Sequence, residues 1–131
     1  MARFALSLSG SPDTSLAAHT ALDFAHQLVA EGHQLCCVFF YQDAVLLASQ
    51  LRCTPQDETD LTQAWQDFAQ QHQIELQVCI AAALKRGIIN DSEAARHGRP
   101  HANLASGFVL TGLGQLIEAW HQADRAVHFH A

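Results

Sequence analysis

An uninterrupted apolar run at residues 34–41, QLCCVFFY, constrains the fold more than any other part of the sequence. It is rich in aromatic residues and is bounded by Gly32 and Asp43. A strand that is apolar at every position is buried on both faces, and such strands are typical of parallel sheets, which helices cover on both sides. The run therefore predicts a central strand of a parallel sheet.

The segments before this run supply the rest of a βαβ unit. Residues 3–9 (RFALSLS) read as a short apolar strand, and residues 14–31 repeat apolar side chains at the spacing of an amphipathic helix. Asp13 or Thr14 is a candidate N-cap for that helix, and Gly32 stands where a C′ glycine belongs. Two parallel strands joined by a helix form a right-handed crossover in nearly all proteins.

The rest of the chain continues the alternation of strands and helices. The expected elements are a short helix at 44–50, a helix at 61–72, a strand at 74–78, a helix at 80–86, a polar surface segment at 90–101, a strand at 107–111, a helix at 115–122 and a strand at 125–129. This pattern predicts an α/β fold, a three-layer sandwich with a mainly parallel five-stranded sheet. The length fits one domain, so residues 1–131 are expected to form a single domain.

Charge and composition narrow the classes of function. The net charge is −6, with seven Lys and Arg against thirteen Asp and Glu, so direct nucleic-acid binding is not expected. Only 15% of the residues are charged, so part of the surface is expected to be covered by partner subunits. No signal peptide and no apolar run of transmembrane length is visible, so we expect a cytoplasmic protein without membrane contact.

Four cysteines without a CxxC motif are expected to be free thiols. Cys79 follows the strand predicted at 74–78 and precedes the helix predicted at 80–86. At a helix start, unpaired backbone N–H groups stabilise a thiolate, which is the nucleophile of sulfur exchange. A strand-end cysteine can equally serve as a small hydrophobic side chain of the core, and the residues alone leave both interpretations open.

The other cysteines, the histidines and two loops give weaker evidence of a functional site. Cys36 and Cys37 lie inside the apolar run and are expected in the core, while Cys53 lies in a polar connection and is expected at the surface. The nine histidines show no metal-ligand spacing, so no metal site is expected. Residues 9–14 and 111–114 are candidate phosphate loops, which leaves open a flavin- or nucleotide-binding α/β module.

Several stretches resemble the DsrE/TusD family. They are 38–41 (VFFY), 64–66 (AWQ), 78–84 with 86–87 (VCIAAAL and RG), and 107–114 followed by 124–125 (DR). The resemblance extends over almost the whole chain. It implies a flavodoxin-like, DsrEFH-like fold, and a heterohexamer in which TusB-like and TusC-like subunits join this one, two copies of each.

The resemblance also implies a role for Cys79. In that family the cysteine at this position accepts sulfane sulfur as a persulfide, so Cys79 is the residue expected to be catalytic. The donor would be a TusA-like carrier and the acceptor a TusE-like protein, in the route to 2-thiouridine at the tRNA wobble position. No cofactor is expected, and another protein would handle the tRNA. A DsrE-type sulfur carrier of dissimilatory sulfur oxidation is the alternative within the family.

Overall fold

The computed structural model describes residues 1–130. Its elements in chain order are β1 (Arg3–Leu8), α1 (Ala17–Ala30), β2 (Gln34–Phe40), the 3-10 helix η1 (Gln42–Ala48), α2 (Leu61–His72), β3 (Leu76–Cys79), α3 (Ile80–Lys85), α4 (Asp91–Arg96), β4 (Phe108–Thr111), α5 (Leu113–Gln122) and β5 (Arg125–Phe129). The predicted alternation of five strands with helices is confirmed. No helix among the described residues is long and apolar enough to span a bilayer.

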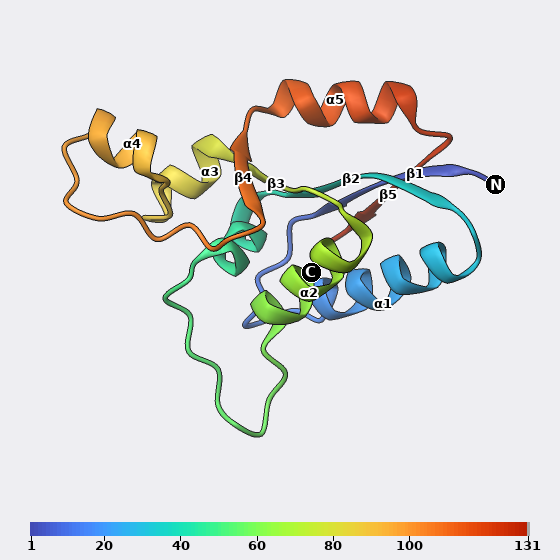
Figure 1. The fold of residues 1–131 in the computed structure, drawn as a ribbon, viewed down its shortest axis with the longest axis horizontal. Coiled ribbons are helices and arrows are strands. Elements are labelled where there is room, and N and C mark those ends of the chain that lie inside the picture. The colour runs from blue at the N-terminus through green and yellow to red at the C-terminus, as the bar shows by residue number, and fades with distance from the viewer. Residues whose placement is uncertain (131) are drawn as a thin grey trace.

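The five strands form one sheet in the order β4-β3-β2-β1-β5, and every neighbouring pair is parallel. The chain leaves β1 toward β2, β3 and β4, and then returns to add β5 on the other side of β1. Because crossovers are right-handed, this reversal puts α1 and α2 on one face of the sheet and α5 on the other. Figure 1 shows these three layers, with α3 and α4 beyond the carboxyl ends of the strands.

The face of the sheet that carries α1 and α2 holds the larger part of the aromatic core. Phe40 of β2, which is fully buried, meets Trp65 of α2 edge to face at a ring-centre distance of 5.4 Å. The indole Nε1 of Trp65 donates to the carbonyl oxygen of Ala18 at 3.2 Å and so ties α2 to α1. Burying one such side chain stabilises the fold by roughly 2 kcal/mol. The predicted central position of the 34–41 run is confirmed.

The opposite face of the sheet is covered by α5, and less completely. Leu116 is the one residue of α5 that is buried. Three apolar side chains of the same helix, Leu113, Ile117 and Trp120, remain 43%, 51% and 45% exposed. Exposed apolar side chains gathered on one helix mark a surface suited to a partner.

The start of α1 differs from the prediction. The helix begins at Ala17, and its N-cap residue is Leu16, whose side chain makes no capping hydrogen bond. Asp13 does not cap the helix, because its carboxylate accepts from both terminal nitrogens of Arg52 at 3.2 and 3.3 Å. The predicted end is confirmed, since Gly32 follows the helix with a φ of +84°, which favours glycine.

The segment at 90–101 contains a helix that the sequence pattern did not predict. The Oδ1 atom of Asn90 accepts from the backbone N–H of Glu93 at 2.9 Å and caps α4. The helix has only six residues and two of them, Glu93 and Ala94, are buried, so it carries too little apolar periodicity to stand out in the sequence. The short helix expected at 44–50 is the 3-10 helix η1, which begins two residues earlier.

Candidate functional site

Cys79 ends β3 and is the N-cap residue of α3, so its predicted place between a strand and a helix is confirmed. It lies opposite Thr111 in the parallel register of β3 and β4. This places it at the carboxyl edge of the sheet, where open α/β sheets bind their ligands. The residue is 2% exposed, and its side chain makes no hydrogen bond to the first turn of α3.

The 3-10 helix η1 packs against both elements that meet at Cys79, which are β3 and α3. It begins at Gln42, whose φ of +49° costs roughly 1 kcal/mol in a residue that has a Cβ. Nε of Arg86, the C-cap residue of α3, donates to Oδ1 of Asp43 at 2.9 Å, and its Nη1 donates to the carbonyl oxygen of Ala82 at 3.0 Å. One guanidinium therefore connects the end of α3 to η1.

The other cysteines have different surroundings, and all four thiols are free. Cys37 is buried in β2, and its Sγ donates to Oε1 of Gln77 at 3.4 Å. Burial, with smaller contributions from the neighbouring Cys36 and Glu75, raises the pKa of Cys37 to about 11. Cys53 is exposed, as expected, and lies in the loop between η1 and α2. Cys79 is therefore the cysteine at the carboxyl edge of the sheet.

A pocket of about 600 Å³ lies between α5 and the carboxyl ends of β1, β2 and β5, and we call it the α5 pocket. It is lined by Ser7, Ser9, Tyr41, Gln42, Leu113, Leu116, Ile117, Trp120, His128 and His130. It lies where the strand order reverses, beside the ends of β1 and β5, which is the usual ligand position in open α/β sheets. Its lining contains no Lys or Arg that would attract a phosphate.

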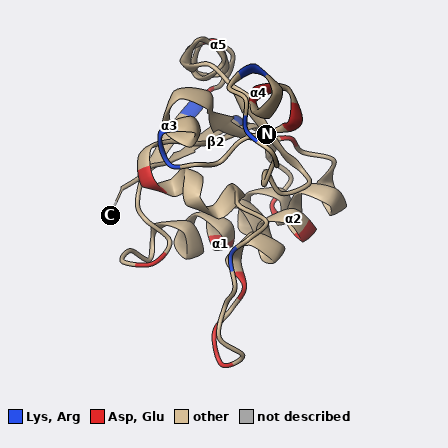
Figure 2. Ribbon diagram, turned by 90° about the vertical axis from the view of Figure 1, so that its left-hand side faces the viewer, with Lys and Arg blue, Asp and Glu red and all other residues tan. Residues whose placement is uncertain are grey.

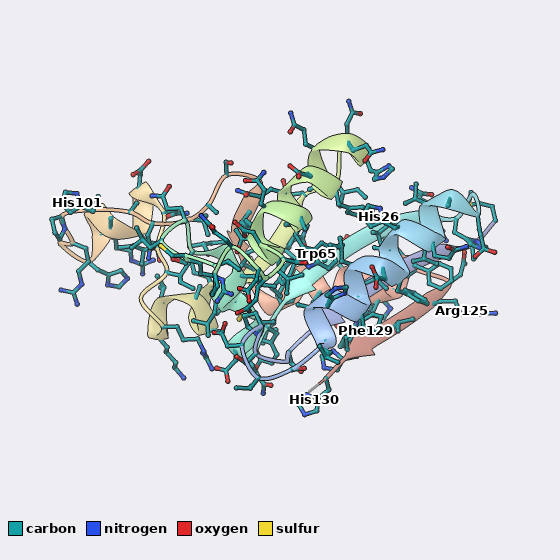
Figure 3. All side chains as sticks on the ribbon, turned by 90° about the horizontal axis from the view of Figure 1, so that it is seen from below. His26, Trp65, His101, Arg125, Phe129 and His130 are labelled. Atoms are coloured by element: carbon teal, nitrogen blue, oxygen red, sulfur yellow. The ribbon has the colours of Figure 1, made fainter. Side chains whose placement is uncertain are left out.

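Two serines and two histidines form a hydrogen-bonded chain along the α5 pocket. Oγ of Ser7 lies 2.6 Å from Nδ1 of His128, and Oγ of Ser9 lies 3.0 Å from Nε2 of the same ring. Oγ of Ser9 also lies 2.7 Å from Nδ1 of His130, which Figure 3 labels beyond the end of β5. Burial, and to a smaller extent the nearby His130, lowers the pKa of His128. The lowered pKa favours the neutral form of the His128 ring, which can then both donate and accept in its contacts with Ser7 and Ser9.

A second pocket, of about 520 Å³, lies between α3 and the segment that follows α4, and we call it the basic pocket. It is lined by Leu84, Lys85, Gly87, Ile89, His97, Arg99, Pro100 and His101. It therefore combines two cations and two imidazoles with apolar side chains. It lies at the opposite end of α3 from Cys79.

The remaining candidate groups do not come together. The loops at 9–14 and 111–114 follow β1 and β4, which β2 and β3 separate, so their backbones are about 14 Å apart at the usual strand spacing. Among residues 1–130, no three His, Cys, Asp or Glu side chains are grouped closely enough to hold a metal ion. His26 of α1 packs against the ring of Phe68 instead.

Sequence reasoning missed both pockets. The sequence contains a signal for the α5 pocket. Ser7 and Ser9 are two residues apart at one strand, and His128 and His130 are two residues apart at another, so each pair is expected on one face of its strand. Nothing in the sequence, however, shows that β5 pairs with β1 in the register that joins these residues. The basic pocket depends on α4, which the pattern did not predict.

Comparison with known proteins shows which family the chain belongs to. Residues 2–129 match the model of the DsrE/DsrF-like family. The chain is 48% identical to "Sulfurtransferase TusD" of Salmonella newport over 127 residues, which cover 97% of this chain and 99% of that protein. It is 47% identical to "Sulfurtransferase TusD" of Serratia proteamaculans over 98% of this chain and 100% of that protein. It is also 47% identical to "Sulfurtransferase TusD homolog" of Vibrio vulnificus, over 97% of each chain.

A solved structure supports the fold independently. The crystal structure of the ychN protein from E. coli superposes with a TM-score of 0.77 and covers 98% of this chain and 100% of that one. The two sequences are 18% identical, so this likeness concerns the fold alone.

Proposed function

The chain belongs to the DsrE/DsrF-like family and is a sulfurtransferase, and on that premise we propose that it relays sulfane sulfur as a Cys79 persulfide. One observation carries this proposal. Cys79 is the cysteine at the carboxyl edge of the sheet, between β3 and α3, whereas Cys37 is buried within β2 with a raised pKa and Cys53 lies in an outlying loop.

The transfer step needs no cofactor. The Cys79 thiolate attacks the outer sulfur of a donor persulfide, R–S–SH, and a new S–S bond forms at Cys79. The S–S bond of the donor breaks, and the donor leaves as a thiolate. The proton stays on the transferred sulfur, so Cys79 becomes Cys79–S–SH without net oxidation. An acceptor thiolate then repeats the same attack on the outer sulfur of Cys79.

A movement of η1 is part of the proposal, because Cys79 is 2% exposed and η1 packs on both elements that meet there. A partner thiol must approach the sulfur in line with the S–S bond, and a buried thiol does not permit that approach. The strained start at Gln42 and the exposed ion pair of Asp43 with Arg86 make the first turn of η1 the part that we expect to open, because later residues such as Leu47 are buried in the core.

We propose further that a TusA-like carrier donates the sulfur, that a TusE-like protein accepts it, and that the product is 2-thiouridine at the tRNA wobble position. TusB-like and TusC-like subunits would complete a cytoplasmic heterohexamer, with residues 1–131 as a single domain. Two features support an oligomer: the low fraction of charged residues and the exposed apolar face of α5. The similarity to proteins named TusD favours this branch of the family over a DsrE-type carrier of dissimilatory sulfur oxidation.

The pathway is tested in cells that lack their own TusD. Expression of the parent chain with its partner subunits is expected to restore 2-thiouridine in tRNA, measured by nucleoside mass spectrometry, and Cys79→Ser is expected not to restore it. If the parent chain restores nothing although its Cys79 takes up sulfur, the tRNA branch is wrong and the dissimilatory alternative is favoured.

A further inference from the structure

The chain is acidic overall, but its cations are concentrated on and beside α3, the helix that follows Cys79. Four of the seven Lys and Arg residues lie between residues 85 and 99, compared with two of the thirteen Asp and Glu residues. Figure 2 shows these blue segments around α3 and α4. The local sign of the charge is therefore opposite to that of the rest of the molecule.

Two of these cations have no partner within the described residues. Arg86 is held by η1, and Arg96 lies 3.7 Å from the carboxylate of Glu93. In residues 1–130, no carboxylate forms an ion pair with Lys85 or Arg99, and both of these exposed residues line the basic pocket. Their charges are available to a group from outside the chain.

Hydrogen bonds made by Asn103 hold the backbone segments around the basic pocket together. Nδ2 of Asn103 donates to the carbonyl oxygen of Gly87 at 2.9 Å, and its Oδ1 accepts from the N–H of Ile89 at 2.9 Å. The backbone N–H of Asn103 donates to the carbonyl oxygen of Ile89 at 3.0 Å. These bonds fasten the segment that carries Arg99 and His101 to the residues that follow α3.

The position of the basic pocket relates it to Cys79. Lys85 is the sixth residue after Cys79, which corresponds to about 9 Å along a helix. A short segment of a protein bound in the pocket is therefore long enough to bring a cysteine of that protein to Cys79. The two cations are exposed, and Leu84, Ile89 and Pro100 line the pocket beside them. This mixture suits the side chains of a docking protein better than it suits an enclosed small anion.

We propose that the basic pocket docks an acidic segment of the protein that exchanges sulfur with Cys79. The inference rests on the proposed sulfur relay and names the chemistry of its partner. Charge complementarity of this kind accelerates encounter and selects partners, and it weakens as salt is added.

The test uses the full chain co-expressed with its partner subunits. Two peptides of equal length carry one cysteine persulfide each, flanked in one peptide by glutamates and in the other by glutamines. Intact mass follows the gain of one sulfur at Cys79. In parallel, fluorescence anisotropy measures binding of the same peptides with serine in place of cysteine. The variants are Lys85→Glu and Arg99→Glu, with Lys85→Gln and Arg99→Gln as milder changes.

Arg125→Glu is the matched control, because it makes the same change of charge at the start of β5. Figure 3 shows Arg125 and His101 at opposite ends of the molecule. At low salt, the glutamate peptide is expected to bind and load at least threefold better than the glutamine peptide. Lys85→Glu and Arg99→Glu are expected to remove this preference, the glutamine variants to reduce it, and Arg125→Glu to retain it.

Equal binding and loading of the two peptides by the parent complex would overturn the docking proposal and leave the relay standing. Preferential binding of the glutamate peptide without any sulfur at Cys79 would support docking and contradict the relay. Displacement of the glutamate peptide by inorganic phosphate more strongly than by chloride at equal ionic strength would make the pocket a small-anion site, which also overturns the proposal.

Discussion

Nε of Arg86 and Oδ1 of Asp43 lie 2.9 Å apart and join the end of α3 to η1. The two side chains are 30% and 57% exposed, so this is a surface ion pair of modest strength, about 0.2–1 kcal/mol. It holds η1 against α3, and η1 packs on α3 and β3, the two elements that meet at Cys79. A weak contact at this position is consistent with the opening of η1 that we propose for sulfur transfer.

Asp43→Asn is expected to make Cys79 more accessible. Removing the charge of Asp43 weakens the link to Arg86, so η1 opens more often and the buried thiol is exposed more often. The rate of alkylation of Cys79 in the isolated chain should rise about twofold to fivefold, as the strength of an exposed ion pair implies. The rate is measured by quenching with iodoacetamide and mapping the labelled peptides.

Asp124→Asn serves as the control, because Asp124 pairs with Arg3 at the amino edge of the sheet, far from η1. This variant should leave the alkylation rate of Cys79 unchanged. An unchanged rate in Asp43→Asn as well would show that the Arg86 link does not limit access to the thiol.

Cys53 and Cys37 are expected to be the fastest and the slowest of the four thiols to react. Cys53 is exposed and should be alkylated first, while Cys37 should be the slowest, because burial and a pKa of about 11 keep its thiol protonated near neutral pH. Peptide mapping during alkylation of the native chain measures this order. Alkylation of Cys37 before Cys53 would contradict the placement of Cys37 in the closed interior of the sheet.

The lowered pKa of His128 makes the folded chain less stable as the pH falls below about 6.5. Burial, helped by His130, lowers its pKa in the folded state below the usual 6.5, so the unfolded chain takes up this proton first as the pH falls. This contribution to stability is complete above pH 6.5 and is lost as the pH falls through the folded-state pKa. Urea unfolding above and below pH 6.5 should show a smaller loss for His128→Asn than for the parent chain. An equal loss in both proteins would contradict the prediction.

Trp120→Glu is expected to prevent assembly without unfolding the chain. The indole of Trp120 is 45% exposed on α5, whereas the fully buried Trp65 belongs to the core. Co-purification with the partner subunits measures assembly, and circular dichroism checks the fold. Leu16→Glu is the control, because Leu16 is 78% exposed beside α1 on the other face of the sheet. Assembly of Trp120→Glu at the parent level would exclude the α5 face as the subunit interface.

The sequence predicted the sheet well, because its central strands are buried on both faces and leave an unbroken apolar pattern. The predicted bounds 61–72 and 125–129 match α2 and β5, since periodicity or flanking polar residues define their ends. The helix α1 begins three residues later than predicted. Asp13 has the chemistry of an N-cap, but it pairs instead with Arg52, which is distant in the sequence.

The site could be predicted only in part. The local pattern predicts Cys79 at a strand end, but its burial and the Arg86–Asp43 link depend on contacts between distant segments. The Ser9 and His130 contact likewise requires the pairing of the first strand with the last. Short elements such as α4 bury too few residues to leave a periodic signal, so the basic pocket could not be foreseen.

Sulfur loading of the assembled complex tests the proposed role of Cys79 most directly. The parent protein and the variants Cys36→Ser, Cys37→Ser, Cys53→Ser and Cys79→Ser are incubated with a persulfide-loaded donor, and intact mass with peptide mapping locates the added sulfur. We expect one sulfur at Cys79 in the parent and in the first three variants, and none in Cys79→Ser. An unchanged sulfur load in Cys79→Ser would contradict the assignment of Cys79 as the relay cysteine.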